Sequence, residues 1–355
     1  MGLPFLDFFA GSGLVTEGLA PYFRAVFAND VCPRKRAVYE ANHGAGHFHF
    51  GSIEAVRGGE LPRAVLSWGS FPCQDLSLAG RGEGLGAGRS GLFWQWLRVM
   101  DEMPEPPAVL AAENVAGLVA SSGGAHYRAL HEALIARGWR AGAVMLDAAD
   151  WLPQSRPRVF VAAARRGTDV SGLTADGPGY GHPATLVKAV EGLSDFTWWR
   201  LPEPEGTGAS LESLVEWDAP CDAREKTARL LELMPEGHRR KLDAAISRGE
   251  RVFPGYRRTR RAGQVFELRF DGLAGCLRAP RGGSSRQSLM LVREGGLLSR
   301  LLTVREAARL MGAPDSYVIP GSYNDGYHAM GDAVAVAAVR HLARHLLAPL
   351  AERAA

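Results

Sequence analysis

The sequence predicts a doubly wound α/β fold with a smaller second domain, and two observations carry that prediction. Residues 1–165 alternate short apolar runs with helical patterns, and strands that alternate with helices are typical of a parallel sheet covered on both faces. The pattern changes after Arg166, because residues 167–299 are rich in Gly, Pro and Arg and show few clear helices. This change predicts a second, more irregular domain.

The predicted elements are taken from hydrophobic periodicity. The strands are expected at LPFLDFF (3–9), RAVFAND (24–30), AVLSWGSF (64–71), AVLAAENV (108–115), AGAVMLDA (141–148) and RVFVAAAR (158–165). Helical spacing is found from residue 14, at 36–44, 91–103 and 126–138, and again at 303–312 and 333–353. Gly44 and Gly138 close two of these helices, as glycine commonly does.

The composition is that of an ordinary folded protein and does not by itself indicate an activity. The chain has 355 residues, 46% hydrophobic and 22% charged, which is ordinary for a protein with a packed core. The net charge is only +3, yet lysine occurs at four positions, so 37 of the 41 basic residues are arginine. A GC-rich genome and bidentate contact to phosphates or bases both account for this bias.

Targeting and metal signals are weak in this sequence. The four cysteines form no C-x-x-C pair, and the histidines of NHGAGHFHF have no acidic or cysteine partner close by, so no metal site is expected. MGLPFLDFF has no basic region before its apolar run, so we expect no signal peptide. No apolar segment approaches the roughly 20 residues of a membrane-spanning helix. We therefore expect a protein of the reducing cytoplasm.

The turn after the first predicted strand has features of a nucleotide pocket. LDFFAGSG places Gly11 and Gly13 between a strand and a helix, where glycine permits close backbone approach to a ligand. The second strand ends in Asp30, about 20 residues further on, and a carboxylate there accepts hydrogen bonds from ribose hydroxyls. Together they favour an adenosine-containing ligand over an ordinary turn.

One cysteine follows a predicted strand in a setting that does not favour burial. Cys73 stands in FPCQD, after the strand at 64–71, and glycine occupies every second position from Gly80 to Gly88. Most free cysteines are buried small hydrophobic residues. Pro72 and the polar, glycine-rich sequence after Cys73 instead predict an exposed thiol beneath a mobile lid.

Further polar residues lie at the ends of other predicted strands. Glu113 is near the end of the strand at 108–115, and QSRPR places Gln154, Arg156 and Arg158 around the start of the next. Arg156 and Arg158 are two residues apart, so on an extended chain their side chains point the same way. Each residue alone fits a surface ion pair, whereas the set at successive strand ends predicts an active site.

These motifs together resemble those of the cytosine-5 DNA methyltransferases. LDFFAGSG, GSFPCQDLSLAG, ENV and QSRPR look like the signature motifs of that family in its usual order, RLLTVREAARLMGAPDSY is similar to the motif after its recognition domain, and GDAVAVAAV to its closing motif. The matches run from about residue 5 to 345 with an unmatched middle. The resemblance implies a Rossmann-like AdoMet-dependent methyltransferase sheet, formed by residues 1–166 and 320–355, with a smaller irregular target-recognition domain at 167–319.

The resemblance also implies the catalytic roles. Cys73 is the expected nucleophile, since a thiolate added at carbon 6 of cytosine makes carbon 5 enamine-like. Glu113 is expected to hold N3 and the exocyclic amine, and Arg158, with Arg156 nearby, the O2 side and a flanking phosphate. The base that removes the carbon 5 proton is not identified, and water is one candidate. The cytosine must leave the helical stack to reach the thiol.

The cofactor implied by the resemblance is S-adenosyl-L-methionine. The residues expected to bind it are Asp7, Phe9, Gly11, Gly13, Asp30, Val31, Ser52, Ile53 and Asp332. Four positions depart from the family pattern: Leu14 replaces a frequent glycine, Ser52 a usual aspartate, Asp332 a common asparagine and Ala335 a common proline. These departures concern cofactor affinity more than the type of reaction.

An arginine-rich region is expected to contact DNA. Nine arginines lie between Arg251 and Arg286, with Glu267 and Asp271 as the only acids, which suits phosphate contacts and one or two guanines. Within it, GCLRAPRGGSSRQ resembles the recognition element with a Thr-Leu pair, replaced here by Cys276-Leu277. The expected DNA contacts are Gln74, Ser77, Arg81, Gln154, Arg258, Arg260, Arg278, Arg281, Ser284, Ser285 and Arg286.

Three functions are compatible with these observations. The first is methylation of cytosine in a short duplex DNA site, the second is the same chemistry on RNA, and the third is a catalytically silent DNA-binding homologue. The arginine-rich region and the absence of a Cys-Phe-Thr sequence after ENV favour DNA over RNA. The expected partners are double-stranded DNA and a cognate restriction endonuclease, with no membrane, and the protein is expected to be a monomer in a bacterial cytoplasm, associated with the nucleoid.

Overall fold

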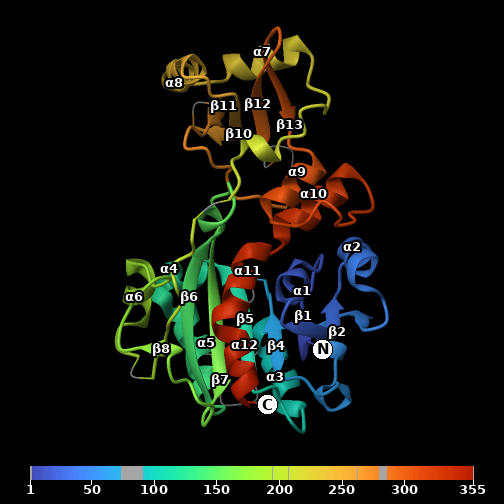
Figure 1. Ribbon diagram of the computed structural model, residues 1–355, viewed down its shortest axis with the longest axis vertical. Helices are drawn as coiled ribbons and strands as arrows, with labels where there is room; N and C mark the ends of the chain where they lie inside the picture. Colours follow the sequence, from blue (N-terminus) through green and yellow to red (C-terminus); the bar gives the residue numbers. More distant parts are fainter. Residues whose placement is uncertain are drawn as a thin grey trace. The chain divides into compact units, whose positions relative to one another are not determined.

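The computed structural model describes residues 2–72, 91–193, 195–206, 208–261, 263–279 and 286–354. The chain divides into two compact units (Figure 1). Unit 1 comprises residues 1–147, 157–205 and 338–355, and unit 2 comprises 148–156 and 206–337. These boundaries differ from those predicted at 166 and 320, because residues 167–205 pack with the first unit and helices of the last segment with the second. The recognition role of the second domain stays a prediction.

Unit 1 is built on a seven-stranded sheet of order β3-β2-β1-β4-β5-β7-β6. Its strands are β1 (Leu3–Phe8), β2 (Phe23–Asp30), β3 (Phe48–Phe50), β4 (Leu66–Gly69), β5 (Val109–Val115), β6 (Trp139–Asp147) and β7 (Pro157–Arg165). The α/β class and all six predicted strands are confirmed. The three-residue β3 was not predicted, since it is too short to show a period.

One strand of this sheet runs against the others. Neighbouring strands from β3 to β5 pair in parallel, whereas β7 is antiparallel to both β5 and β6. The connection from β6 to β7 is residues 148–156, shorter than the dozen or more residues that a parallel crossover needs. The start of β7 therefore lies at the same edge as the end of β5, with Arg158 opposite Val115.

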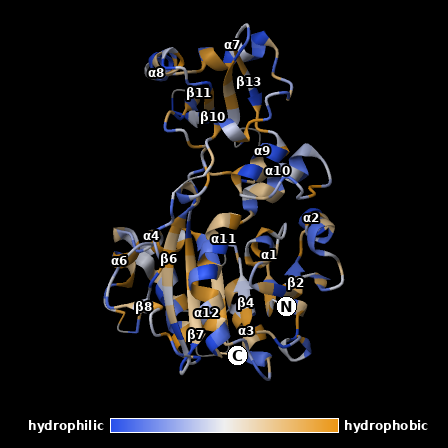
Figure 2. Cartoon of the chain, in the orientation of Figure 1, coloured by the Kyte–Doolittle hydropathy of each residue, from blue (hydrophilic) through white to orange (hydrophobic). Residues whose placement is uncertain are grey.

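Helices of unit 1 cover the sheet through apolar faces. They are α1 (Leu14–Leu19), α2 (Pro33–His43), α3 (Leu92–Glu102), α4 (Gly117–Ala120), α5 (Ala125–Ile135), α6 (Ala184–Val190), α11 (Val336–Leu342), the π-helical η7 (Ala343–Leu347) and α12 (Ala348–Ala354). In α3, Phe93, Trp96 and Met100 recur at helical spacing and are fully buried, and the Trp96 indole N–H donates to Ser67 Oγ of β4 at 2.9 Å. Figure 2 shows the predominantly hydrophobic colouring of β6 and β7.

The remaining short elements of unit 1 lie in its connections. They are the 3-10 turns η1 (Ile53–Ala55), η2 (Gly58–Glu60) and η4 (Ser121–Gly124), and the ribbon formed by β8 (Thr174–Ala175) and β9 (Trp198–Trp199). The chain before β9 packs tightly on β6, because a Cβ at Gly142 would lie 1.9 Å from the carbonyl oxygen of Thr197. Glycine at position 142 is therefore required for this packing.

The C-terminal helices contain an apolar stretch that the sequence pattern did not single out. Residues Tyr323–Ala354 are long and apolar enough to cross a membrane by length and composition alone, and 61% of the qualifying window is buried inside the protein. Helices in the core of a folded protein meet the same criterion. This finding corrects the expectation that no segment approaches that length.

Unit 2 is more regular than the sequence predicted. Four antiparallel strands, in the order β11-β10-β12-β13, have the bounds β10 (Val252–Arg260), β11 (Gly263–Leu268), β12 (Ser288–Arg293) and β13 (Gly296–Leu301). The helices are α7 (Arg224–Glu232), α8 (Glu236–Ser247), α9 (Val304–Leu310) and α10 (Tyr323–Asp332), with 3-10 turns η5 (Ala148–Asp150) and η6 (Glu212–Leu214). Phe253, Phe266 and Met290 from the sheet pack with Leu230 and Leu242 of α7 and α8. Helices α7 and α8 were not predicted, because both are strongly charged and bury only a narrow apolar face.

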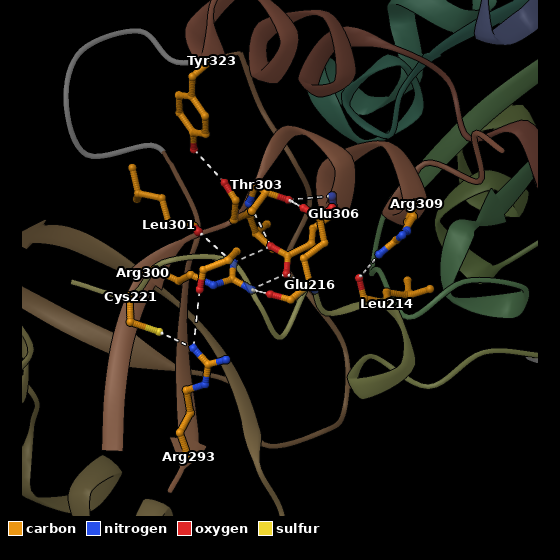
Figure 3. Close-up of polar contacts among 12 residues, drawn as sticks. Leu214, Glu216, Cys221, Arg293, Arg300, Leu301, Thr303, Glu306, Arg309 and Tyr323 are labelled. Atoms are coloured by element: carbon orange, nitrogen blue, oxygen red, sulfur yellow. Dashed lines mark hydrogen bonds and ion pairs between the residues drawn. The ribbon is translucent and has the colours of Figure 1, made fainter. Parts of the chain in front are cut away.

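A buried ion pair joins β13 to α9 in unit 2. The guanidinium of Arg300 donates to both carboxylate oxygens of Glu306, at 2.5 and 2.7 Å, and the side chains are only 4% and 2% exposed (Figure 3). The same guanidinium donates to the carbonyl oxygen of Glu216 at 3.0 Å, and Glu306 also closes the capping box of α9 with Thr303. Removing one member of such a pair leaves a buried charge without its partner.

Candidate functional site

The first two strands of unit 1 end in a turn whose backbone is fixed by one carboxylate. Asp30 Oδ2 accepts a hydrogen bond from the Gly11 N–H at 2.9 Å, and its Oδ1 accepts one from the Cys32 N–H at 2.7 Å. Gly11 and Gly13 adopt left-handed conformations, and so does Phe9, with a φ of 58°. A non-glycine residue in this region is strained and is typical of functional turns.

This turn lies at the topological switch point of the sheet. The chain proceeds from β1 outward to β2 and β3 and then returns to β4 on the other side of β1. In open α/β sheets the crevice beyond the carboxyl ends of the strands at such a point binds ligands. The structure thus brings the predicted turn of Gly11 and Asp30 to the position where a ligand is expected.

One exposed apolar side chain next to Asp30, that of Val31, is suited to a flat aromatic ligand, whereas the predicted contact Ile53 is part of the buried core. Val31 is 66% exposed, which is high for a large hydrophobic residue, whereas Ile53 is 2% exposed. Ser52 is exposed and caps η1 by accepting from the Glu54 N–H at 3.3 Å. An exposed apolar residue beside a polar turn is an expected feature of a binding site.

Asp7 has a different place from the one predicted. Its side chain is fully buried, and its Oδ2 accepts a hydrogen bond from the Thr16 hydroxyl at 2.8 Å. Burial, helped by the charge of Asp30, raises the pKa of Asp7 to about 7. The chain of contacts continues from Thr16 to the hydroxyl of Tyr39 at 3.2 Å, and from there to His47 Nε2 at 3.0 Å. Asp7 therefore supports the turn from behind rather than contacting a ligand directly.

Glu113 and Arg158 meet at the edge of the sheet. Arg158 Nε lies 2.9 Å from Glu113 Oε1, and the two side chains are 13% and 11% exposed. They come from antiparallel neighbours, near the end of β5 and the start of β7, so the reversed direction of β7 brings them together. The pair is sheltered from water, where charge-assisted hydrogen bonds are stronger than at an exposed surface.

Cys73 lies outside the described residues, but the segment that leads to it is fixed. The Asn114 amide donates to the carbonyl oxygen of Phe71 at 2.9 Å, and the Ser70 N–H donates to the carbonyl oxygen of Phe8. Asn114 follows Glu113 directly, so neighbouring residues of β5 bond Phe71, two residues before Cys73 in the sequence, and Arg158. Sequence reasoning assigned no role to Asn114, although an amide at the end of an apolar strand was a signal for one.

Gln154 and Arg156 are buried within unit 2, unlike the prediction. Gln154, expected to contact DNA, is 0% exposed and bonds the backbone of Leu277 and Leu310. Arg156, expected beside Arg158 in the active site, is 2% exposed and donates to carbonyl oxygens of Leu277, Gly331 and Ala333. The two-residue spacing did not place both arginines in one site, because residue 156 precedes β7 and bonds to unit 2.

The predicted DNA-contacting arginines fall into two groups. Arg258 and Arg260 of β10 both pair with Glu267 of β11, at 3.1 and 2.7 Å. Arg286 donates to Asn324 Oδ1 at 2.6 Å. Arg278 is exposed, and no described residue forms an ion pair with it. Six predicted contacts lie outside the described residues: Gln74, Ser77, Arg81, Arg281, Ser284 and Ser285.

Asp332 ends α10 in unit 2. Its Oδ2 lies 3.7 Å from Nδ1 of His328 one turn earlier, and the side chain is partly exposed. Its predicted contact with the cofactor stays a prediction.

Comparison with known proteins identifies the family. A family model described as C-5 cytosine-specific DNA methylase matches residues 3–348. Type II methyltransferase M.NlaX from Neisseria lactamica is 26% identical over 97% of this chain and 96% of its own length, and M.HhaI from Haemophilus parahaemolyticus is 26% identical over 97% and 94%.

Solved structures share the fold at lower identity. The Dnmt2 methyltransferase of S. pombe has a TM-score of 0.63 at 18% identity, covering 98% of this chain and 99% of its own. The methyltransferase EhMeth of Entamoeba histolytica has a TM-score of 0.66 at 11% identity, covering 98% of each chain. The fold is thus that of the AdoMet-type methyltransferases. The chain belongs to the C-5 cytosine-specific DNA methylases, and it is an enzyme of that family, which confirms the resemblance read from the sequence motifs.

Proposed function

We propose that this enzyme methylates carbon 5 of a flipped-out cytosine in a short duplex DNA site, through a covalent adduct of Cys73. The observation that supports this most is the sheltered pair of Glu113 and Arg158, at the edge where Asn114 bonds Phe71, two residues before Cys73 in the sequence. A carboxylate and a guanidinium side by side match the polar edge of cytosine. Glu113 binds N3 and the exocyclic amine, while Arg158 binds O2 and holds Glu113 in place.

The proposed reaction forms and breaks the Cys73–carbon 6 bond. The Cys73 thiolate adds to carbon 6, and N3 takes a proton from the carboxyl group of Glu113 as the ring electrons move toward it. Carbon 5, now nucleophilic, takes the methyl group. A base removes the carbon 5 proton, and the returning electron pair expels the thiolate from carbon 6. Arg156 takes no part, since its guanidinium is bound to backbone carbonyls of unit 2.

The residues at the first turn fit S-adenosyl-L-methionine as the cofactor. When bound, this cofactor supplies the methyl group on a sulfonium sulfur. Asp30 retains unused lone pairs after binding Gly11 and Cys32, so it has the capacity to accept ribose hydroxyls. The exposed Val31 offers an apolar surface for the adenine ring, and the strained turn of Phe9, Gly11 and Gly13 lets backbone approach the ligand.

Duplex DNA is the proposed substrate rather than RNA. The curated relatives, at 26% identity, are named Type II methyltransferases. Two solved structures with the same fold are named Dnmt2, but they are only 18% identical to this chain and therefore support the fold alone. Exposed Arg257 and Arg278 of unit 2 suit phosphates or guanines. We further propose a monomer acting in the bacterial cytoplasm, at the nucleoid, with a cognate restriction endonuclease as a second partner. RNA methylation is the alternative.

Methylation mapping tests this proposal. The protein is expressed in cells that lack cytosine methylation, and their DNA is sequenced after bisulfite conversion. Protected cytosines within one short motif, absent with the Cys73→Ala variant, are the expected result. Protection in RNA alone would support the alternative, and a well-expressed protein that protects no cytosine would refute both.

A further inference from the structure

Two buried side chains of unit 2 fix both backbone polar groups of Leu277. Gln154 Oε1 accepts the Leu277 N–H at 3.0 Å, and Arg156 Nη1 donates to the Leu277 carbonyl oxygen at 2.7 Å. Gln154 is in turn fixed by the carbonyl oxygen of Leu310 at 2.6 Å, and Arg156 by those of Gly331 and Ala333 at 3.1 and 2.5 Å. Leu277 therefore has one backbone position, set by residues 154 and 156.

Other contacts hold the same segment, residues 275–279. Tyr256 donates its hydroxyl to the Cys276 carbonyl oxygen at 2.9 Å, and Gln287 Oε1 accepts the Gly275 N–H at 2.6 Å. On the opposite side, a Cβ at Gly331 would lie 2.5 Å from the carbonyl carbon of Arg278, so α10 touches the backbone there. Such a density of buried bonds around a segment without regular secondary structure is expected where a side chain must be held in a defined orientation.

These bonds fix the backbone next to one exposed side chain, that of Arg278. It is exposed and directly follows Leu277, which is 1% exposed. Arg258, Arg260 and Arg269 of the same region are each paired with Glu267 or Asp271, whereas within the described part of the chain Arg278 has no acidic partner. A guanidinium free to form two parallel hydrogen bonds is the group that reads O6 and N7 of guanine, and that contact requires defined geometry.

We propose that Gln154 and Arg156 are positioning residues for sequence discrimination. By fixing the backbone of Leu277, they orient the next side chain, that of Arg278, toward a base edge of the DNA site. The inference rests on the proposed function, since it presupposes a specific DNA substrate. Arg156 is also only two residues from Arg158, so one short segment contains both a residue that positions Arg278 and the arginine paired with Glu113. The same backbone thus links the choice of site to the residues that hold the target cytosine.

The test compares two buried arginine-to-lysine variants of unit 2. Arg156→Lys keeps the charge but replaces a planar fork, bonded to three carbonyl oxygens, by a point charge. Arg300→Lys is the matched control, because Arg300 is equally buried and bonded to Glu306 and Glu216 but does not contact residues 275–279 (Figure 3). Each is assayed for kcat/KM on the methylation site and on sites with one base pair changed, for binding of S-adenosylhomocysteine, and for thermal stability.

The expected result is a loss of discrimination confined to Arg156→Lys. Its preference for the correct site falls by about tenfold or more, the effect of losing one good base contact, and cofactor affinity is unchanged. Arg300→Lys lowers the melting temperature without changing site preference. Equal preference in Arg156→Lys and wild type at matched stability would overturn the inference.

A milder variant keeps the test decisive if Arg156→Lys does not fold. Gln154→Asn is one methylene shorter and cannot bond Leu277 and Leu310 together, so it too should lower site preference; retained preference in a folded Gln154→Asn protein would overturn the proposal. Failure of the proposed function itself is a separate outcome, because wild-type protein would then methylate no DNA site at all.

Discussion

At the scale of single residues, the decisive feature is a carboxylate and a guanidinium that share one sheltered place. Glu113 and Arg158 are 45 positions apart, yet their side chains meet at 2.9 Å because β7 runs against β5. Neither is fully buried, so both remain accessible to a small planar ligand. Their mutual pairing orients Glu113 without consuming all its acceptor sites.

Replacing Glu113 by Gln should abolish most of the methyl transfer. The amide keeps the shape but cannot transfer a proton to N3, which neutralises the ring charge formed when the thiolate adds, so kcat should fall by about 10²–10⁴-fold, with little change in cofactor affinity. Single-turnover methylation of a cognate duplex measures this effect. Glu105→Gln, which alters only the exposed pair with Arg63, is the control and should retain activity. A Glu113→Gln enzyme as active as wild type would exclude the assigned role.

The buried Asp7 predicts a pH dependence of stability. The pKa of Asp7 is raised from 3.8 to about 7 in the folded protein, so its stabilising contribution is complete below pH 3.8 and is lost as the pH rises toward 7. The slope from this group is at most about 1.4 kcal/mol per pH unit. Asp7→Asn removes it, and its stability should therefore gain on that of wild type between pH 5 and pH 8.

Denaturant unfolding at several pH values measures this difference. Asp169→Asn is a suitable control, because Asp169 is exposed and its pKa is lowered by the hydroxyl and N–H of Ser171, which predicts no loss of stability toward pH 8. Parallel pH profiles for wild type and Asp7→Asn would contradict the assigned titration.

At the scale of elements, the arginines of the β10–β11 hairpin and Arg278 are expected to make different kinds of contact with DNA. Two of its arginines share Glu267, so about half of their charge is compensated within the hairpin. Phosphate contacts raise affinity for all sequences alike, whereas base contacts change preference among them. Substitutions in the hairpin should therefore change overall DNA affinity, whereas substitution of Arg278 should change the preference among DNA sequences.

Arg258→Ala should weaken DNA binding uniformly. If its guanidinium contacts a phosphate, the slope of log K against log salt should fall by about one, with no change in site preference. Glu267→Gln should have the opposite effect, strengthening binding at low salt. Titrations of cognate and unrelated duplexes over a range of salt concentrations test both variants. Unchanged binding in both would place the hairpin away from DNA.

Packing between β6 and the chain before β9 should be sensitive to one methyl group. A Cβ at Gly142 would overlap the Thr197 carbonyl oxygen at 1.9 Å, so Gly142→Ala must move buried backbone and should cost roughly 1–3 kcal/mol. Gly177→Ala is the matched control, since nothing lies within 4 Å of the Cβ it would add. Thermal unfolding compares the two, and equal melting temperatures would contradict the packing described.

At the scale of the whole molecule, the two units contain different sets of the proposed site residues. Unit 1 contains the glycine turn, Asp30, Glu113 and Arg158, and unit 2 contains the arginine-rich sheet and the segment that precedes Arg278. The chain crosses between units within QSRPR, so Arg156 and Arg158 bond in different units. A ligand of unit 1 should therefore stabilise that unit without requiring DNA.

S-adenosylhomocysteine at a concentration 100 times its Kd should stabilise the folded protein by about 2.7 kcal/mol. Asp30→Ala should remove this effect, because it removes the ribose acceptor and the bonds to Gly11 and Cys32. Asp101→Ala, which loses only an exposed pair with Arg137, should keep it. Calorimetry with and without the ligand decides, and a full shift in Asp30→Ala would argue against the proposed pocket.

The sequence by itself determined the class of fold, six strands of the unit 1 sheet and the family, because these depend on local periodicity and on short ordered motifs. Only the tertiary structure decided which motif residues act together. Arg156 and Arg158 look equivalent in QSRPR, but one is buried against carbonyl oxygens and the other pairs with Glu113. Asp7 and Gln154 look like ligand contacts in the sequence and are fully buried. Burial and partners depend on residues distant in sequence, such as Leu277 and Thr16 here, which local patterns do not reveal.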